Sequence, residues 1–333
     1  MDAGNSPQHT AGETENLFPF GPPPVLSRPI SYEGTRVIAR NTVQRTLIEK
    51  LPKFRVVHDD PVTVALDYAK SGFRVPFICA ANRFAPGERH DDQRDRPTYE
   101  EDFCGRSNLV DTLTRTGPGT YVPRLYPIPA TGGIFSDRVV VYLGPRGDNY
   151  EKLDPIPDLP VVLVHPVRKP PVQGYGTKYQ HQTDEEVMGE KIREALHICL
   201  HHNYDRIVIG DFGLGDGFHH PPQAVAEIWR ELLLFNCHFR GRFESVDFAF
   251  IDPVQSTTKW FRDERHRRNE ETRIGDSAST SRAEPPCSQP APTDMAIFES
   301  VFDEKEIERV LQHAASIDSH LLLMNSHFRS FEA

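Results

Sequence analysis

The sequence predicts an α/β fold in which helices cover a central sheet, and three observations support this. Short apolar runs recur between residues 54 and 251, and several are apolar at nearly every position, as strands covered on both faces are. Segments with helical spacing stand between these runs. The 333 residues, 38% of them hydrophobic, are enough to build a substantial core.

Six segments are expected to form strands because they are short, apolar and rich in β-branched or aromatic residues. They are residues 54–57, 75–80, 138–143, 159–164, 206–209 and 245–251. Strands interleaved with helices indicate one layered α/β domain, which we expect to span residues 31–262.

Capping signals mark the expected helices. In DDPVTVALDYAKSG, residues 59–72, an Asp precedes the helix, Pro61 stands near its first position and Gly72 ends it. Residues 183–186, TDEE, have the pattern of a capping box, and apolar residues follow at helical spacing. Further helices are expected within residues 27–51 and from residue 221 to 233.

The flanks differ in composition from this domain. Residues 1–30 and 263–294 are rich in Pro, Gly, Ser or charge and lack periodicity, so we predict a disordered N-terminal arm and a disordered linker. Residues 295–333 regain helical spacing and predict a C-terminal helical segment. We expect it to dock on the domain, and the alternative is a helix that binds a partner's groove.

Composition excludes several classes of function. A net charge of −10 and a pI near 5.8 argue against direct nucleic-acid binding, which needs a basic face. No apolar run approaches the ~20 residues of a membrane span, and the N-terminus lacks the features of a signal peptide. We therefore predict an intracellular protein, cytoplasmic or nuclear, that does not bind membranes.

Cysteine and histidine patterns predict no metal site and no cofactor. The 5 cysteines are widely spaced, odd in number and form no CxxC pair. Cys79 and Cys199 lie in apolar runs and are expected to be core residues. His219 and His220 are adjacent, with no third ligand in view, so we expect solvated loop histidines.

A glycine-rich stretch, GDFGLGDGF at residues 210–218, stands where an expected strand leads into a helix. Gly210, Gly213, Gly215 and Gly217 supply bare backbone at the place where open α/β sheets bind anions, so we predict an anion site. A tight turn without a ligand is the alternative. Nearby carboxylates oppose an anion, and no Gly-Lys-Ser/Thr follows to make a P-loop.

A pair of carboxylates stands in PTYEEDFCGRSNLVDTL, residues 97–113. Acidic residues are favoured in the first turn of a helix by its dipole, so the pair has a structural explanation. Glu100 and Glu101 point about 100° apart on a helix and cannot face each other as a dyad. One carboxyl could instead protonate a leaving group while the other holds a hydroxyl, which suits cleavage of a glycosidic bond.

Taken together, these segments resemble the microbial-type poly(ADP-ribose) glycohydrolases, a macrodomain-like family. The resemblance covers about residues 30–255 and includes VPFICAAN, YEEDFCGRSNL, RVVVYLG, PVVLVHPV, RIVIGDFGLGDGF and FESVDFAFID in that order. It implies a three-layer α/β/α fold with a mixed central sheet and a ligand cleft at the strand ends.

The resemblance also implies roles for individual residues. Glu101 would be the catalytic acid that protonates the departing ribose oxygen, and Glu100 would position the terminal ribose. Gly213, Gly215 and Gly217, with Gly210, would wrap the diphosphate of ADP-ribose, and Phe218 could stack on a ring. The implied partner is ADP-ribose or an ADP-ribosylated protein.

The sequence departs from the family in the loop before the carboxylates. Where the family has three glycines, this chain has Ala85, Pro86 and Gly87 followed by Glu88, and Tyr99 replaces a glutamine. Gly87 is thus the glycine left to contact ligand there. The predicted function is ADP-ribose binding with glycohydrolase activity. The alternatives are an inactive ADP-ribose reader or scaffold, or a hydrolase of another ADP-ribosyl or nucleotide compound.

Overall fold

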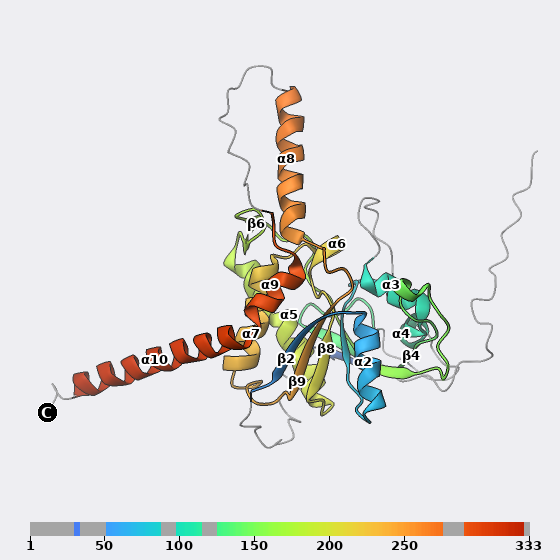
Figure 1. The fold of residues 1–333 in the computed structure, drawn as a ribbon, viewed down its shortest axis with the longest axis horizontal. Helices are drawn as coiled ribbons and strands as arrows, with labels where there is room; N and C mark the ends of the chain where they lie inside the picture. Colours follow the sequence, from blue (N-terminus) through green and yellow to red (C-terminus); the bar gives the residue numbers. More distant parts are fainter. Residues whose placement is uncertain (1–29, 34–50, 88–97, 115–124, 276–289, 330–333) are drawn as a thin grey trace, which may run out of the picture.

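The computed structural model describes residues 30–33, 51–87, 98–114, 125–275 and 290–329. They form a seven-stranded sheet with helices on both faces, as Figure 1 shows. The strands are β1 (Ile30–Glu33), β2 (Lys53–His58), β3 (Phe77–Ala80), β4 (Gly132–Val140), β5 (Asp158–Val164), β8 (Arg206–Ile209) and β9 (Ser245–Phe250). A separate two-stranded ribbon pairs β6 (Val172–Gln173) with β7 (Lys178–Tyr179).

The strand order is β1-β4-β5-β3-β8-β9-β2. Neighbours from β5 to β2 run parallel, whereas β4 is antiparallel to both β1 and β5, so the sheet is mixed as expected. All six expected strands are present. β4 begins at Gly132, whereas the prediction began at residue 138. The prediction missed the first half of the strand because it contains two glycines and the polar Ser136 and Asp137, which interrupt the apolar run.

Alternate residues of the strands face two separate cores, which confirms the three-layer α/β/α fold. On β5, Val162 and Val164 face the core shared with α5 (Gln182–His201), α7 (Pro222–Phe235) and α9 (Asp294–Val301). Val161 and Leu163 face the core shared with α2 (Pro61–Lys70), α3 (Tyr99–Arg106) and α4 (Leu109–Thr114). This period-two alternation is what a strand covered on both faces requires.

The caps of two helices show how local signals succeed and fail. Asp60 is the N-cap of α2 and accepts a hydrogen bond from the Thr63 N–H, with Pro61 at the start of the helix as expected. The capping box predicted at Thr183 is wrong. α5 begins at Gln182 after His181, which makes no side-chain cap hydrogen bond, so Thr183 already lies inside the first turn.

Two expectations for the N-terminal part need correction or lie outside the described residues. Residues 30–33, expected to be helical, form β1, because they pair with β4 in an antiparallel ladder that local spacing cannot reveal. The remainder of that expected helix, residues 34–50, and the N-terminal arm before residue 30 lie outside the described residues.

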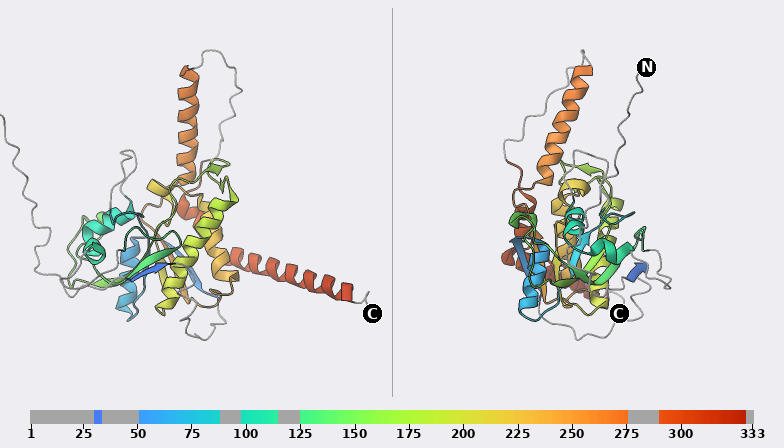
Figure 2. Two further views of the ribbon diagram at one scale, coloured as in Figure 1. Left: turned by 180° about the vertical axis from the view of Figure 1, so that it is seen from behind. Right: turned by 90° about the vertical axis from the view of Figure 1, so that its right-hand side faces the viewer.

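The expected linker is partly helical. Residues 263–275, predicted to be disordered, continue α8 (Thr257–Gly275), so the predicted boundary at 262 falls inside a helix. Glu264 bonds to Arg267 and Arg268 one turn later, and such pairs favour helix where composition alone suggests disorder. Figures 1 and 2 show α8 and α10 (Glu304–Arg329) projecting away from the sheet.

The C-terminal segment docks on the domain through α9, as expected. Ile297, Phe298, Val301 and Phe302 are buried in the core that contains α7. The Phe302 ring lies 4.8 Å from the Phe54 ring and 4.5 Å from the Phe248 ring, measured between centroids.

None of the helices in the described ranges is both long and apolar enough to cross a membrane. Cys79 and Cys199 are buried core residues, as predicted.

Candidate functional site

A cleft of about 560 Å³ lies at the carboxyl ends of the central strands. Its lining includes Asp60 after β2, Asp211 after β8 and Asp252 after β9, together with Glu101 of α3. Open α/β sheets place ligands at this edge, because the loops that leave neighbouring parallel strands converge there. The position of the cleft therefore agrees with the site expected from the sequence.

Thr98 fixes the start of α3 and with it the position of Glu101. The Thr98 Oγ1 accepts a hydrogen bond from the Glu101 N–H at 3.4 Å, and the hydroxyl also lies 3.3 Å from Glu101 Oε1. Glu101 is half-buried and lines the cleft. A carboxylate at the N-terminus of a helix faces unpaired N–H groups and the positive end of the helix dipole.

Glu100 points into the protein and differs chemically from its neighbour. Its side chain is 2% exposed, and Oε2 accepts a hydrogen bond of 2.6 Å from the Asn82 N–H. Burial raises the pKa of Glu100 to about 8, with the backbone N–H groups of Asn82 and Gly87 opposing the shift. Glu100 therefore holds a proton at neutral pH. Its Oε1 has no hydrogen-bond partner among the described residues.

Gly87 supports this helix and is not part of the cleft lining. Its φ is +64°, and a Cβ there would lie 2.9 Å from the Cys104 Sγ, so the loop can pass over α3 only with a glycine at this position. The structure shows a packing role for Gly87, and the ligand contact expected of it stays a prediction. Glu88 lies outside the described residues.

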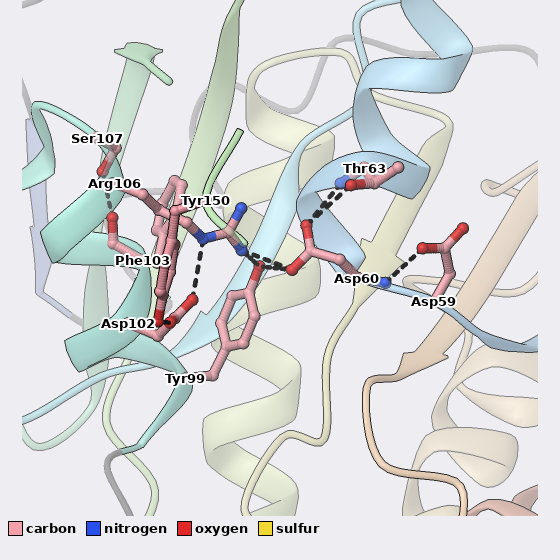
Figure 3. Close-up of polar contacts among 9 residues, drawn as sticks. All are labelled: Asp59, Asp60, Thr63, Tyr99, Asp102, Phe103, Arg106, Ser107 and Tyr150. Atoms are coloured by element: carbon pink, nitrogen blue, oxygen red, sulfur yellow. Dashed lines mark hydrogen bonds and ion pairs between the residues drawn. The ribbon is translucent and has the colours of Figure 1, made fainter. Parts of the chain in front are cut away.

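Arg106 anchors α3 through a buried polar network, drawn in Figure 3. Its guanidinium donates to Asp60 Oδ1 at 2.5 Å and to Asp102 Oδ2 at 3.0 Å, and it also bonds to the Tyr99 hydroxyl. The Tyr99 hydroxyl donates to Asp60 Oδ1 at 2.7 Å, and the Tyr150 hydroxyl donates to Asp102 Oδ1 at 2.8 Å. The network ties α3 to the beginning of α2 and so holds Glu101 at the cleft and Glu100 inside the protein.

The sequence motif contains Arg106 and Tyr99 but gives neither a role. Arg106 is 1% exposed, and a buried arginine needs charged partners. The only indication in the sequence was a single arginine in an otherwise ordinary helix. The carboxylate that pairs with Arg106 depends on contacts between residues far apart in the sequence. Asp60 lies 46 residues earlier, and sequence alone assigns it only to a helix cap.

The glycine stretch forms the loop between β8 and α7, with a short helix α6 (Gly215–Phe218) inside it. Gly213, Gly215 and Gly217 have positive φ. The chain's own side chains occupy the space beside them. A Cβ on Gly213 would meet Met188 at 2.7 Å, one on Gly215 would meet Gln255 at 2.4 Å, and one on Gly217 would meet Thr98 at 3.0 Å. Internal packing therefore explains part of why glycine is needed at these positions.

The glycine loop and α3 lie side by side. Besides the contact of Gly217 with Thr98, a small cavity of about 20 Å³ between them is lined by residues of both, including Gly210, Thr98 and Phe218. Phe218 is 6% exposed, and the Arg168 guanidinium carbon lies 5.9 Å from its ring centroid. The structure thus brings the two predicted motifs together but leaves little space at the glycine side.

The expectation that His219 and His220 are solvated is wrong. They are 1% and 0% exposed. The His220 Nδ1 lies 2.7 Å from the Tyr179 hydroxyl and its Nε2 lies 2.5 Å from the Val167 carbonyl oxygen, and burial lowers the pKa of His220 to about 4. The His219 ring stacks on Trp260 of α8 at 3.8 Å between centroids. Distant segments cover these histidines, which a local loop pattern cannot show.

No group of three or more His, Cys, Asp or Glu side chains suited to a metal ion occurs among the described residues.

Three residues that the sequence did not single out, Gln255, Thr257 and Asp294, contact the glycine loop directly or through one another. No local pattern connects them, because Asp294 is 37 residues from Thr257 and stands at the end of the segment predicted to be a disordered linker.

The fold and the cleft at its strand ends define a macrodomain-like α/β/α protein. Solved structures of poly(ADP-ribose) glycohydrolase share the fold. The enzyme from Thermomonospora curvata superposes with a TM-score of 0.55 at 20% sequence identity, covering 71% of this chain and 85% of that one. The Deinococcus radiodurans enzyme in complex with ADP-ribose gives a TM-score of 0.53 at 20% identity and covers 72% and 94%.

A T. curvata structure bound to the inhibitor ADP-HPD gives a TM-score of 0.52 at 22% identity, covering 71% of this chain and 84% of that one. No protein-family model matches the sequence, and no curated protein matches it. The comparisons therefore establish the fold. The activity must be argued from the residues of this chain.

Proposed function

We propose that the protein is an ADP-ribosyl glycohydrolase that cleaves a ribose glycosidic bond with Glu101 as the catalytic acid. The observation that carries the proposal is the pair of unlike carboxyls at the beginning of α3. Glu101 reaches the cleft, whereas Glu100 is buried and protonated at neutral pH. Fold likeness to enzymes whose structures hold ADP-ribose or an inhibitor supports the choice of ligand.

The proposed reaction uses the Glu101 carboxyl twice, first as an acid and then as a base. The Glu101 carboxyl gives its proton to the departing oxygen as the bond between that oxygen and the anomeric carbon breaks. Water then adds to the oxocarbenium-like carbon and loses a proton to the Glu101 carboxylate, which restores the acid. Glu100 lies outside the cleft lining, and in its protonated form it holds the start of α3 in place through its hydrogen bond with the Asn82 N–H.

The test is a binding titration followed by an assay of hydrolysis. ADP-ribose is titrated calorimetrically into the full chain, and release of ADP-ribose from ADP-ribosylated protein is then compared between the parent, Glu101→Gln and Glu308→Gln. Glu308 is exposed on α10 and serves as the matched control. We expect Glu101→Gln to lose activity by about 10²- to 10⁴-fold with ADP-ribose affinity kept, and Glu308→Gln to behave as the parent.

A Glu101→Gln protein as active as the parent would refute the assignment of the acid. Micromolar affinity without turnover in the parent would favour the alternative of a catalytically inactive ADP-ribose reader. Absence of binding at millimolar ADP-ribose would leave only the fold in common with the glycohydrolases.

The charge of the cleft favours a second candidate, a protein that acts on a single ADP-ribosyl group or another nucleotide rather than on the polymer. Among the described residues, the cleft lining carries Glu101, Asp211 and Asp252, besides Asp60 and Asp102, which pair with Arg106, and its only basic side chain is Arg146. Two unit charges ~5 Å apart interact by roughly 3 kcal/mol at an effective dielectric of 20, so further phosphates add to the repulsion. Competition by poly(ADP-ribose), ADP-ribose and AMP for the same site would separate the two candidates.

A further inference from the structure

Gln255 covers the middle of the glycine loop. An ideal Cβ on Gly215 would lie 2.4 Å from Gln255 Oε1 and 2.5 Å from its Nε2, and the φ of Gly215 is +56°. Only a residue without a side chain allows this approach. Gly215, expected to leave room for a diphosphate, therefore leaves room for a side-chain amide of the same chain.

Asp294, from the C-terminal segment, holds that amide in place. Its carboxylate is 0% exposed and accepts hydrogen bonds from Gln255 Nε2 at 3.0 Å, from Thr257 N–H at 2.8 Å and from the Thr257 hydroxyl at 2.7 Å. The Asp294 N–H in turn donates to the Gln255 carbonyl oxygen at 2.9 Å. We call Gln255, Thr257 and Asp294 the Asp294 cluster.

The Asp294 cluster also occupies a backbone donor of the loop. The Gly215 N–H donates to Thr257 Oγ1 at 3.0 Å, so this N–H, expected to meet a phosphate oxygen, is already used. Asp294 lies one hydrogen bond further away. A carboxylate so near the loop disfavours an anion, and burial raises the pKa of Asp294 to about 6, which leaves it mainly charged at neutral pH.

Gln255 stands between the open cleft and the loop. It lines the cleft of about 560 Å³, whereas the cavity under the glycine loop measures about 20 Å³. Gln255 and Glu101 line the same cleft, and the Gln255 amide covers Gly215. Gln255 is only partly buried, so its side chain has solvent to move into.

We propose that Gln255, positioned by Asp294, determines specificity by narrowing the diphosphate end of the cleft, so that ligands with a diphosphate bind more weakly than they would without the Gln255 amide. This inference rests on the proposed function for its ligand. It adds that the C-terminal segment, through Asp294, sets the shape of the site. Removing the Gln255 amide opens the path to the glycine loop.

The experiment compares ligands that differ in phosphate. The full chain, Gln255→Ala, Asp294→Asn and the control Gln223→Ala, whose amide bonds to Glu227 on α7, are titrated with ADP-ribose, adenosine and inorganic pyrophosphate. We expect Gln255→Ala to bind ADP-ribose and pyrophosphate at least about tenfold more tightly than the parent, and adenosine within about twofold. Asp294→Asn changes the same ratio in the same direction, and the control does not.

The outcomes separate this inference from the proposed function. ADP-ribose binding that Gln255→Ala leaves unchanged or weakens overturns the specificity role and leaves the proposed function standing. Pyrophosphate binding that appears in Gln255→Ala, with ADP-ribose bound by no variant, supports the narrowing role of Gln255 and refutes the proposed function. Absence of ADP-ribose and pyrophosphate binding in the parent and in every variant overturns both.

If Asp294→Asn fails to fold, hydrogen exchange on Gln255→Ala gives a second measurement. Loss of the amide that covers Gly215 should speed exchange of backbone N–H groups in residues 210–218 relative to the parent, with exchange in α5 unchanged. Equal exchange in the two proteins would show that Gln255 does not shield the loop.

Discussion

The two ends of the cleft are built in different ways. At the α3 end, buried polar groups are joined by hydrogen bonds that also hold Asp60 and Asp102, and the Glu101 carboxyl lines the cleft without a bond to this network. At the glycine-loop end, the bare backbone is covered by the chain's own side chains, and the Gly215 N–H bonds to Thr257. The first end is therefore held by a buried polar network, and the second by side chains packed against glycines.

The largest effect is expected when the α3 end loses its buried charge pair. Arg106→Met leaves the Asp60 carboxylate, whose side chain is 3% exposed, without its cation. Removing one partner of a buried ion pair typically costs about 3–5 kcal/mol. We expect the free energy of unfolding, measured by urea titration, to fall by roughly that amount.

A surface pair provides the control for Arg106. Arg193→Met removes an ion pair with Glu190 whose side chains are 28% and 48% exposed, and such pairs are worth about 0–1 kcal/mol. Similar losses for the two arginines would show that the network at α3 does not behave as a buried unit, and the contrast between the two ends would disappear.

The next largest effect concerns pH and Glu100. Because the folded-state pKa of Glu100 is raised to about 8 from an ordinary value near 4.5, its contribution to stability is fully present below pH 4.5 and is lost as the pH rises towards 8. The slope reaches at most about 1.4 kcal/mol per pH unit. Glu100→Gln, which is neutral throughout, should flatten this part of the profile.

Urea unfolding at pH 5.5, 6.5, 7.5 and 8.5 measures the slope in the parent, in Glu100→Gln and in the exposed control Glu308→Gln. We expect the parent and the control to lose stability together as pH rises, and Glu100→Gln to lose less. Parallel profiles for all three proteins would mean that Glu100 ionises as an ordinary surface carboxyl, and its assignment as a buried, protonated group would fall.

The sequence predicted the layered fold and the two motifs at the cleft because those features are local. A strand such as β5 is apolar from Leu159 to Val164, and Asp60 with Pro61 marks a helix start within a few residues. It could not predict what fills the glycine loop. Gln255 lies 40 residues after Gly215 and is fixed by a residue still further along, so only the folded chain joins them.

The same reason explains the histidine error. His219 and His220 stand in a stretch of turn-forming residues, which favours exposure, yet Trp260 and Tyr179 cover them from other elements. Pattern reasoning is dependable where the partner is a turn away. It fails where the partner's identity depends on how the layers pack.

The smallest effect is expected at the outer edge of the network in Figure 3, where Tyr150 donates to Asp102. Tyr150 is 41% exposed, so water can replace its hydrogen bond, and Asp102 keeps its bond to Arg106. Tyr150→Phe should therefore cost no more than about 1 kcal/mol of unfolding free energy.

A double-mutant cycle of Tyr150→Phe with Asp102→Asn isolates this pair from the rest of the network. A coupling energy well below the loss of unfolding free energy caused by Arg106→Met would place the rigid part of the α3 end at Asp60, Tyr99 and Arg106, away from solvent. A coupling as large as the effect of Arg106→Met would extend the rigid unit to the rim of the cleft. Tyr150 would then belong to the framework that holds Glu101, and its ring would be fixed where a ligand enters.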